Sequence, residues 1–192
     1  MDTLFYKKDF RIIREKLEPE LKRLMASREN YAKLVGYLVV AEDHRFFSHP
    51  GYDIIGICRA IYKDIFKGKR EGASTIEQQL VRVLTEDYRF CFSRKIKEIY
   101  LAAMLHRLAD KYTLASAYLY FANYGTDFQG LNRILQKFDV KLEPDLDDVV
   151  CAEVVARLKY PEPRRYNPER MVQIENRRNH ILKLFKEEHD NK

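Results

Sequence analysis

Apolar side chains recur at three- and four-residue spacing along most of this 192-residue chain, and few residues interrupt the pattern. The sequence contains only 7 glycines and 6 prolines, the residues that most often break regular elements. Long apolar-periodic stretches with so few breaks predict a mainly α fold. The length fits one domain with room for a small second lobe, and an apolar share of 46% is enough for a substantial core.

The charge balance narrows the class of partner without choosing one. A formal net charge of +6 favours nucleic acid, an anionic membrane surface or a phosphorylated substrate, and is equally typical of a mildly basic solvated surface. The three cysteines form no C-x-x-C pair and no metal-ligand spacing. We interpret them as small buried apolar residues.

The N-terminal part has two open interpretations. Residues 4–30 alternate charged residues with apolar ones at roughly helical spacing. This pattern is typical of a basic amphipathic helix on a membrane surface, and equally of a surface helix that packs one face on the core. No apolar region of a signal peptide follows the first residues. The longest apolar run, residues 34–41, is far shorter than the about 20 residues that span a bilayer.

Further helices are predicted by the same periodicity, each bounded by a glycine, a proline or a polar cluster. Their ranges are 31–43, 53–66, from 74 onward, 93–108, 113–123, 149–158 and 169–188. Ser74 and Glu77 have the spacing of a capping box, with Ser74 as the N-cap residue and Glu77 three residues later.

Two adjacent carboxylates, Glu42 and Asp43, end the apolar stretch that begins at residue 31. A carboxylate beside apolar walls is a good proton acceptor, and so a candidate general base. Aromatic residues and a histidine follow directly, before a break at residues 49–51. The alternative is that both carboxylates only end the helix on its solvent side.

The helix predicted from residue 74 carries a polar face opposite an apolar one. Thr75, Gln79 and Arg82 lie at i, i+4 and i+7 and so share one side. A hydroxyl, an amide and a guanidinium after a basic, glycine-bounded loop suit a phosphate or sugar-phosphate group. Further along, Arg94 and Glu98 lie four residues apart, a spacing that is typical of a weak surface ion pair.

Taken together and in order, these segments resemble the first three signature motifs of the peptidoglycan glycosyltransferase family. They are E-D-x-x-F-x-x-H-x-G over residues 42–51, G-A-S-T-I-x-Q-Q-L-x-R over 72–82, and R-K-x-x-E over 94–98. That domain occurs in class A penicillin-binding proteins and in monofunctional biosynthetic transglycosylases. A looser resemblance to the fourth and fifth motifs extends it over about residues 31–182.

The resemblance implies a lysozyme-like helical glycosyltransferase domain over residues 31–192, preceded by the segment 1–30 as a basic, membrane-associating element. Such an enzyme polymerises lipid II: the acceptor's 4-hydroxyl attacks C1 of the lipid-linked glycan, forms a β-1,4 bond with inversion, and releases polyprenyl pyrophosphate. This chemistry needs a base and cations beside the pyrophosphate. A divalent cation, Mg²⁺ or Mn²⁺, is expected only from the resemblance.

By matching position, the resemblance makes Glu42 the expected base and Glu98 the second catalytic glutamate. Arg82 stands where the family usually has Lys. The substrate-binding residues that it implies are Asp43, Phe46, His49, Ser74, Thr75, Gln78, Gln79, Arg82, Arg94 and Lys95.

Ser116 and Tyr120 depart from the fourth motif, where the family has Glu and Asn. The family also has an N-terminal transmembrane anchor, which this sequence does not show. We expect either a trimmed chain or attachment to the membrane through surface residues.

The resemblance implies a bacterial protein at the outer, periplasmic face of the cytoplasmic membrane, with a cytoplasmic location left open. Cell-wall synthesis proteins are the expected partners, and nucleic acid is not one. The alternatives are a catalytically weakened module that binds lipid pyrophosphate for regulation, and a lysozyme-like glycan hydrolase.

Overall fold

The computed structural model describes residues 3–68, 72, 74–89 and 91–190, and this part of the chain is built from α-helices with no strand. This confirms the predicted mainly α class. The helices are α1 (Thr3–Ala26), α2 (Arg28–Glu42), α3 (Ile54–Lys67), α4 (Ile76–Thr85), α5 (Phe92–Leu105), α6 (Lys111–Phe121), α7 (Leu131–Lys137), α8 (Asp148–Lys159) and α9 (Pro168–Asp190), with a short 3-10 turn at Phe46–Ser48.

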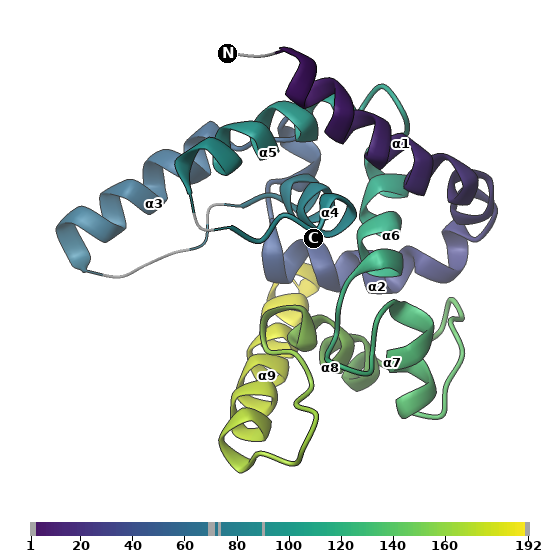
Figure 1. The fold of residues 1–192 in the computed structure, drawn as a ribbon. Helices are drawn as coiled ribbons and strands as arrows, with labels where there is room; N and C mark the ends of the chain where they lie inside the picture. Colours follow the sequence, from purple (N-terminus) through teal and green to yellow (C-terminus); the bar gives the residue numbers. More distant parts are fainter. Residues whose placement is uncertain (1–2, 69–71, 73, 90, 191–192) are drawn as a thin grey trace.

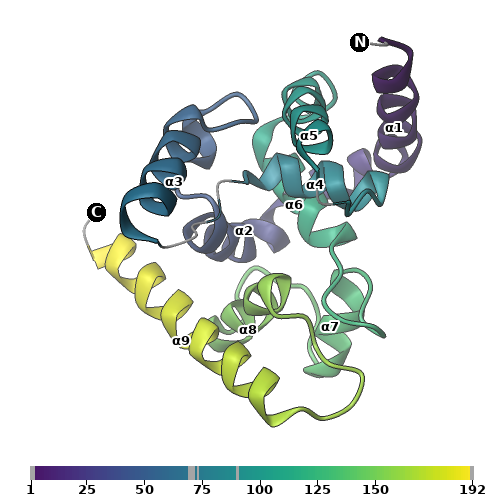
Figure 2. The ribbon, with the colours of Figure 1, turned by 60° about the vertical axis from the view of Figure 1, so that its left-hand side comes forward.

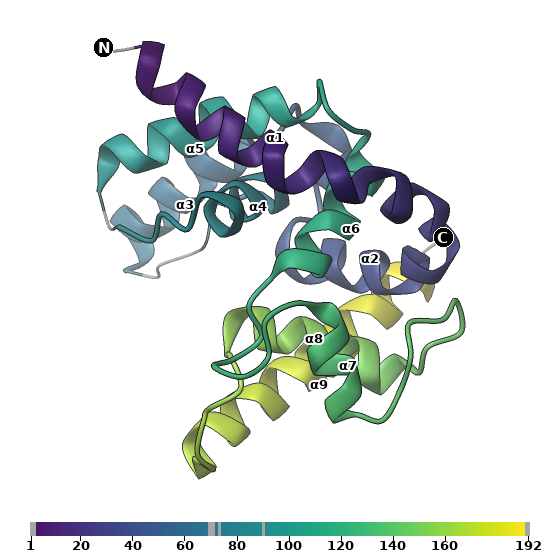
Figure 3. The ribbon, with the colours of Figure 1, turned by 45° about the vertical axis from the view of Figure 1, so that its right-hand side comes forward.

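The helices form a larger group and a smaller lobe. Helices α2, α4 and α6 lie in the middle, α1, α3 and α5 lie at one end, and α7, α8 and α9 form the lobe at the other (Figures 1, 2 and 3). The lobe packs on the rest mainly through α2, which contacts both α8 and α9. In the described part of the chain, no helix combines the length and the apolar character needed to cross a bilayer.

Helix α1 packs one face into the core. Ile13, Leu17 and Leu24 on this helix are fully or almost fully buried, and α1 lies against α4 and α6. For residues 4–30, the structure therefore shows a surface helix that packs one face on the core, which is the second of the two interpretations. Membrane association of the outer face of α1 stays a prediction.

Helix α2 is the central helix because it is apolar on nearly all sides. Seven of its residues are buried, among them Leu34 and Leu38. Gly36 allows α9 to approach closely, since a Cβ at this position would lie 3.3 Å from the Phe185 ring. The same ring stacks on Tyr37 with 3.8 Å between the ring centroids. These contacts place α9 across α2, next to the C-terminal end of α2.

The predicted start of α4 is wrong by one residue. The N-cap is Thr75, whose side chain accepts a hydrogen bond from the backbone N–H of Gln78. The Oγ of Ser74 instead accepts a hydrogen bond from the Lys95 ammonium at 2.8 Å. Glu77 contacts Lys111 with its side chain and forms no capping box. The short helix α7 has no predicted counterpart.

A buried ammonium ties α1 to α5 and to the loop after α4. Lys97 on α5 lies 2.8 Å from Asp9 of α1 and 2.7 Å from Asp87 of the loop. Hydrogen bonds from Arg89, together with Lys97, hold the pKa of Asp87 well below its usual range. The Asp87 carboxylate therefore stabilises the folded state most near neutral pH, and that contribution is lost as the pH falls through its lowered pKa.

We expect Lys97→Met to lower the free energy of unfolding by about 3 kcal/mol, because it removes the ammonium that two carboxylates share and leaves both in place. Urea denaturation followed by circular dichroism measures the change. The matched control is Lys16→Met, which removes an exposed pair with Glu86 and should cost no more than about 1 kcal/mol. Equal effects of the two substitutions would contradict the prediction.

Candidate active site

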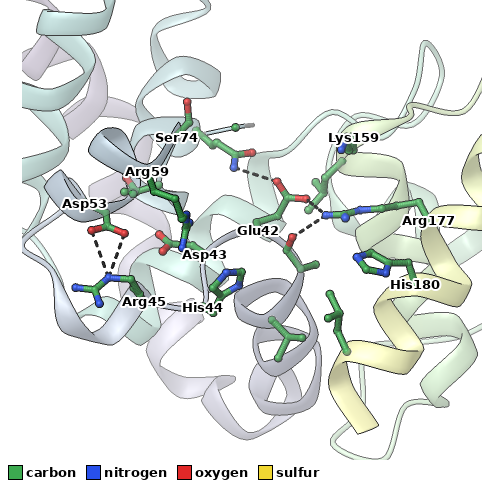
Figure 4. Close-up of a pocket in the computed structure, with 18 of the residues that line it drawn as sticks. Glu42, Asp43, His44, Arg45, Asp53, Arg59, Ser74, Lys159, Arg177 and His180 are labelled. Carbon is green, nitrogen blue, oxygen red and sulfur yellow. Dashed lines mark hydrogen bonds and ion pairs between the residues drawn. The ribbon is translucent and has the colours of Figure 1, made fainter. Parts of the chain in front are cut away.

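A cavity of about 730 Å³ opens where the smaller lobe meets the central helices. One wall comes from the end of α2, from α3 and from α4, and the opposite wall comes from α8 and α9 (Figure 4). Its polar lining residues are Glu42, Asp43, His44, Arg45, Asp53, Arg59, Ser74, Thr75, Gln79, Arg82, Lys159, Arg177 and His180. The cavity therefore has three carboxylates and several cations within reach of one bound molecule.

Glu42, the last residue of α2, is held from both walls. Its Oε2 accepts a hydrogen bond from Gln79 Nε2 of α4 at 3.3 Å, and its Oε1 accepts from Arg177 Nη2 of α9 at 3.0 Å. The same Arg177 nitrogen donates to the carbonyl of Ala41 at 2.6 Å. Figure 4 shows the carboxylate at the centre of the cavity with the guanidinium beside it. With only 15% of its side chain exposed, Glu42 is a largely desolvated carboxylate in a fixed orientation.

A buried tyrosine fixes the amide that faces Glu42. Tyr118 Oη donates to Gln79 Oε1 at 2.6 Å. Burial raises the pKa of Tyr118 well above its usual range, so the phenol stays a hydrogen-bond donor. Because the amide oxygen of Gln79 is taken by this donor, its NH₂ group points to the carboxylate.

Arg82 and Glu98 form a bidentate pair beside the cavity. Arg82 Nε lies 2.9 Å from Glu98 Oε1 and its Nη2 lies 3.2 Å from Oε2. Arg94 Nη1 lies 3.4 Å from the same carboxylate. The hydrogen bonds to Glu98 raise the pKa of Arg82 further above its usual value. Only 2% of the Glu98 side chain is exposed, so the interpretation of Arg94 and Glu98 as a surface pair is wrong.

The Lys95 side chain lies behind the part of the cavity wall that Ser74 forms. Its ammonium donates to Ser74 Oγ at 2.8 Å and to Gln78 Oε1 at 2.6 Å. Burial lowers the pKa of Lys95. Gln78 is fully buried and holds the lysine, while Ser74 reaches the cavity.

Beside Glu42, the first motif contributes Asp43 to the cavity lining, while Phe46 and His49 lie behind it. Asp43 lines the cavity, and its carboxylate accepts from His49 Nε2 at 3.0 Å and from the backbone N–H of Ile76 at 3.3 Å. Phe46 is fully buried and His49 nearly so. These two residues support the turn after α2.

The predicted site residues thus fall into two groups. Those that line the cavity are Glu42, Asp43, Ser74, Thr75, Gln79 and Arg82. Those outside its lining are Phe46, His49, Gln78, Arg94, Lys95 and Glu98. Sequence reasoning missed Tyr118 as a contact of Gln79, and it missed Lys159, Arg177 and His180 on the opposite wall. Arg177 lies in a highly charged helix, and nothing in its spacing distinguishes it from its neighbours.

The comparisons with known proteins match nearly the whole chain. Residues 11–186 match the family model described as Transglycosylase. The chain is 28% identical over 191 residues to penicillin-binding protein 1A of Rickettsia prowazekii, which covers 97% of this chain and 24% of that protein. It is 30% identical over 149 residues to the biosynthetic peptidoglycan transglycosylase of Thiobacillus denitrificans, covering 77% of this chain and 63% of the relative.

A monofunctional glycosyltransferase of Staphylococcus epidermidis is 38% identical over 96 residues, half of this chain and 35% of that protein. The chain spans about a quarter of the length of the penicillin-binding protein of Rickettsia prowazekii. The similarity to relatives of that kind therefore concerns one part of a longer protein.

We expect Arg82→Met to lower the free energy of unfolding by about 2 kcal/mol, because the nearly inaccessible Glu98 loses two charged hydrogen bonds. Arg82→Lys keeps the charge but not the two-pronged contact, so its effect should be smaller. Thermal and urea denaturation of the two variants measures the difference. If Arg82→Lys lowers the free energy of unfolding as much as Arg82→Met does, the bidentate geometry matters and the charge does not.

Proposed function

This chain belongs to the transglycosylase family, and on that premise we propose that it is a peptidoglycan glycosyltransferase that polymerises lipid II. The proposed reaction joins the 4-hydroxyl of one lipid-linked unit to C1 of the growing strand. The bond from C1 to the pyrophosphate breaks, C1 inverts to a β-1,4 linkage, and polyprenyl pyrophosphate leaves. The observation that carries the proposal is a desolvated carboxylate, Glu42, in one cavity with a row of cations.

Glu42 is the proposed general base. Each of its oxygens accepts one hydrogen bond from the protein, and a carboxylate oxygen has capacity for more than one. A hydroxyl in the cavity therefore still finds an acceptor in a fixed position. In the proposed step, the hydroxyl proton passes to Glu42 as the oxygen bonds to C1.

Arg82 is the proposed partner of the leaving pyrophosphate. Two of its five N–H donors point to Glu98, and a guanidinium has three more. Since Arg82 also lines the cavity, those donors are the ones that face a bound phosphate. Negative charge grows on the pyrophosphate as C1 is attacked, and a preorganised cation stabilises that charge. Glu98, held between Arg82 and Arg94, is proposed to orient this guanidinium.

A position at the membrane surface is supported by exposed apolar residues beside the cavity. Ile54, Ile55, Ile65 and Phe66 of α3 are all exposed, and the start of this helix forms part of the cavity wall. A lipid-linked substrate needs an apolar surface next to the site that binds its headgroup. We propose that the protein acts at the outer face of the bacterial cytoplasmic membrane, where cell-wall synthesis proteins are its partners.

A resident divalent metal ion does not fit the group formed by Asp43, His49 and Glu77. Atoms of Asp43, His49 and Glu77 lie within 4.8 Å of one another, near enough to share an ion. The ammonium of Lys111 already lies 2.8 Å from Glu77 and 3.5 Å from His49, so a dication there would face a buried positive charge. The proposed reaction therefore contains no step that depends on such an ion.

The departures in the fourth motif leave this proposal intact. Ser116 is buried in α6 and its hydroxyl donates to the carbonyl of Tyr112 at 3.1 Å. The ring of Tyr120 lies 4.4 Å from the Arg23 guanidinium of α1. Neither residue lines the cavity.

The test is to incubate the purified protein with labelled lipid II in detergent and to separate the products on a gel. We expect glycan strands from the wild-type chain and a rate at least about 10²-fold lower for Glu42→Gln, because a positioned general base contributes about this much or more. The matched control is Glu29→Gln, at the exposed start of the same helix, which should keep the wild-type rate.

Three outcomes separate the proposal from its alternatives. Strands that a β-1,4-specific glycan hydrolase digests, and that moenomycin prevents, support the inverting polymerase. Lipid II binding without polymer would indicate a regulatory module. Cleavage of preformed strands would indicate a hydrolase, whose second carboxylate would have to be Asp43 or Asp53, each already paired within the cavity wall.

A further inference from the structure

We propose that Glu77 and Lys111 form a positioning pair, which fixes the junction between the helix that ends in Glu42 and the helix that carries Gln79 and Arg82. Neither residue lines the cavity. The proposal concerns how the site is held together, and its activity test rests on the proposed function.

Glu77 is a carboxylate with no exposure to solvent, in the first turn of α4. Its Oε1 accepts a hydrogen bond from Lys111 Nζ at 2.8 Å and lies 3.5 Å from His106 Nε2. Its Oε2 has no hydrogen-bond partner among the described residues. A fully buried carboxylate is costly unless it is paired, so the contact with Lys111 is what makes this position tolerable.

Lys111, the first residue of α6, extends the pair to the turn that follows α2. Its ammonium also donates to the carbonyl of Phe46, lies 3.5 Å from His49 Nδ1, and stands 4.3 Å from the centre of the Phe46 ring. One cation thus connects α4, α6 and the 3-10 turn. Removing either charge leaves the other buried without its partner.

The contacts of His49 assign its tautomer. The backbone N–H of Gly51 donates to Nδ1 at 3.2 Å, so that nitrogen is an acceptor and carries no proton. The proton of the neutral ring is then on Nε2, which donates to the Asp43 carboxylate at 3.0 Å. The nearby Lys111 ammonium favours the same tautomer, because it disfavours a proton on Nδ1.

Asp43 completes a closed ring of contacts. Its carboxylate accepts from His49 and from the backbone N–H of Ile76, the first residue of α4. Since Asp43 follows Glu42 directly and Ile76 precedes Glu77 directly, the ring runs from α2 to α4, on to α6, and back through the turn. It sets where the base lies relative to the residues of α4.

The first test compares Glu77→Gln, Lys111→Met and the double variant in the lipid II assay, with rates expressed per folded molecule. We expect each single substitution to lower kcat about 10²-fold with less than about a twofold change in KM, since a small misplacement of reacting groups costs this much. The double variant should be no slower than the slower single variant, because both act through one pair. Lys111→Arg, which keeps the cation, should recover most of the rate.

The control for a purely structural role is Leu135→Ala, which truncates a core residue of α7 in the smaller lobe. It lowers stability without touching the ring of contacts, and its kcat per folded molecule should equal that of the wild-type chain. If Glu77→Gln and Lys111→Met behave like this control, or if their effects on kcat multiply in the double variant, the pair does not position the site.

The second test needs no activity. Long-range ¹H–¹⁵N correlation spectra at pH 7 should show His49 with its proton on Nε2 in the wild-type chain. In Lys111→Met, the positive charge 3.5 Å from Nδ1 is lost, so the ¹⁵N chemical shifts of the ring should move while Gly51 and Asp43 keep the proton on Nε2. A His49 spectrum that Lys111→Met leaves unchanged overturns the proposal. Absence of polymer from the wild-type chain, with the change in the His49 ¹⁵N shifts seen, would overturn the proposed function alone.

Discussion

A carboxylate at the end of a buried helix is the constraint around which the structure is arranged. Glu42 ends α2, the helix that contacts α6, α8 and α9, and most of its side chain is withdrawn from water. A desolvated carboxylate needs donors that the fold itself supplies. One donor comes from α4 and one from α9, so the placement of both helices beside the end of α2 is also what makes the carboxylate tolerable. The two walls of the cavity meet at this one side chain.

The same principle organises the charges behind the cavity. Three largely buried carboxylates outside the cavity lining each have a cation at hydrogen-bonding distance: Glu98 has Arg82, Glu77 has Lys111, and Asp87 has Lys97. Each pair joins two different elements. Since a buried pair contributes little net stability compared with an apolar pair of the same shape, its value lies in fixing orientation. For Arg82 and Lys111 that orientation concerns groups at the cavity wall.

The amino-acid sequence predicted the helices better than the site. The helical class and the polar face of Thr75, Gln79 and Arg82 follow from local patterns, because helix faces are set by residues three and four apart. Glu42 as the base follows only from the resemblance and stays a prediction. The N-cap of α4 was misplaced since two hydroxyls, Ser74 and Thr75, stand side by side, and only tertiary contacts decide between them. Arg177 lies 135 residues from Glu42 in the sequence, and no local pattern links the two.

The contacts of Arg177 also indicate how the roles of the two cavity walls differ. Its guanidinium contacts Glu42 and the carbonyl of Ala41, so much of its donor capacity is used within the protein. Arg82 on the opposite wall directs two of its five donors to Glu98 and makes no other side-chain hydrogen bond to the part of the chain that the structure describes. A guanidinium that is anchored by a carboxylate behind it presents its other edge in a fixed direction. We therefore propose that the Arg82 side of the cavity meets an anion, whereas the Arg177 side holds the proposed base.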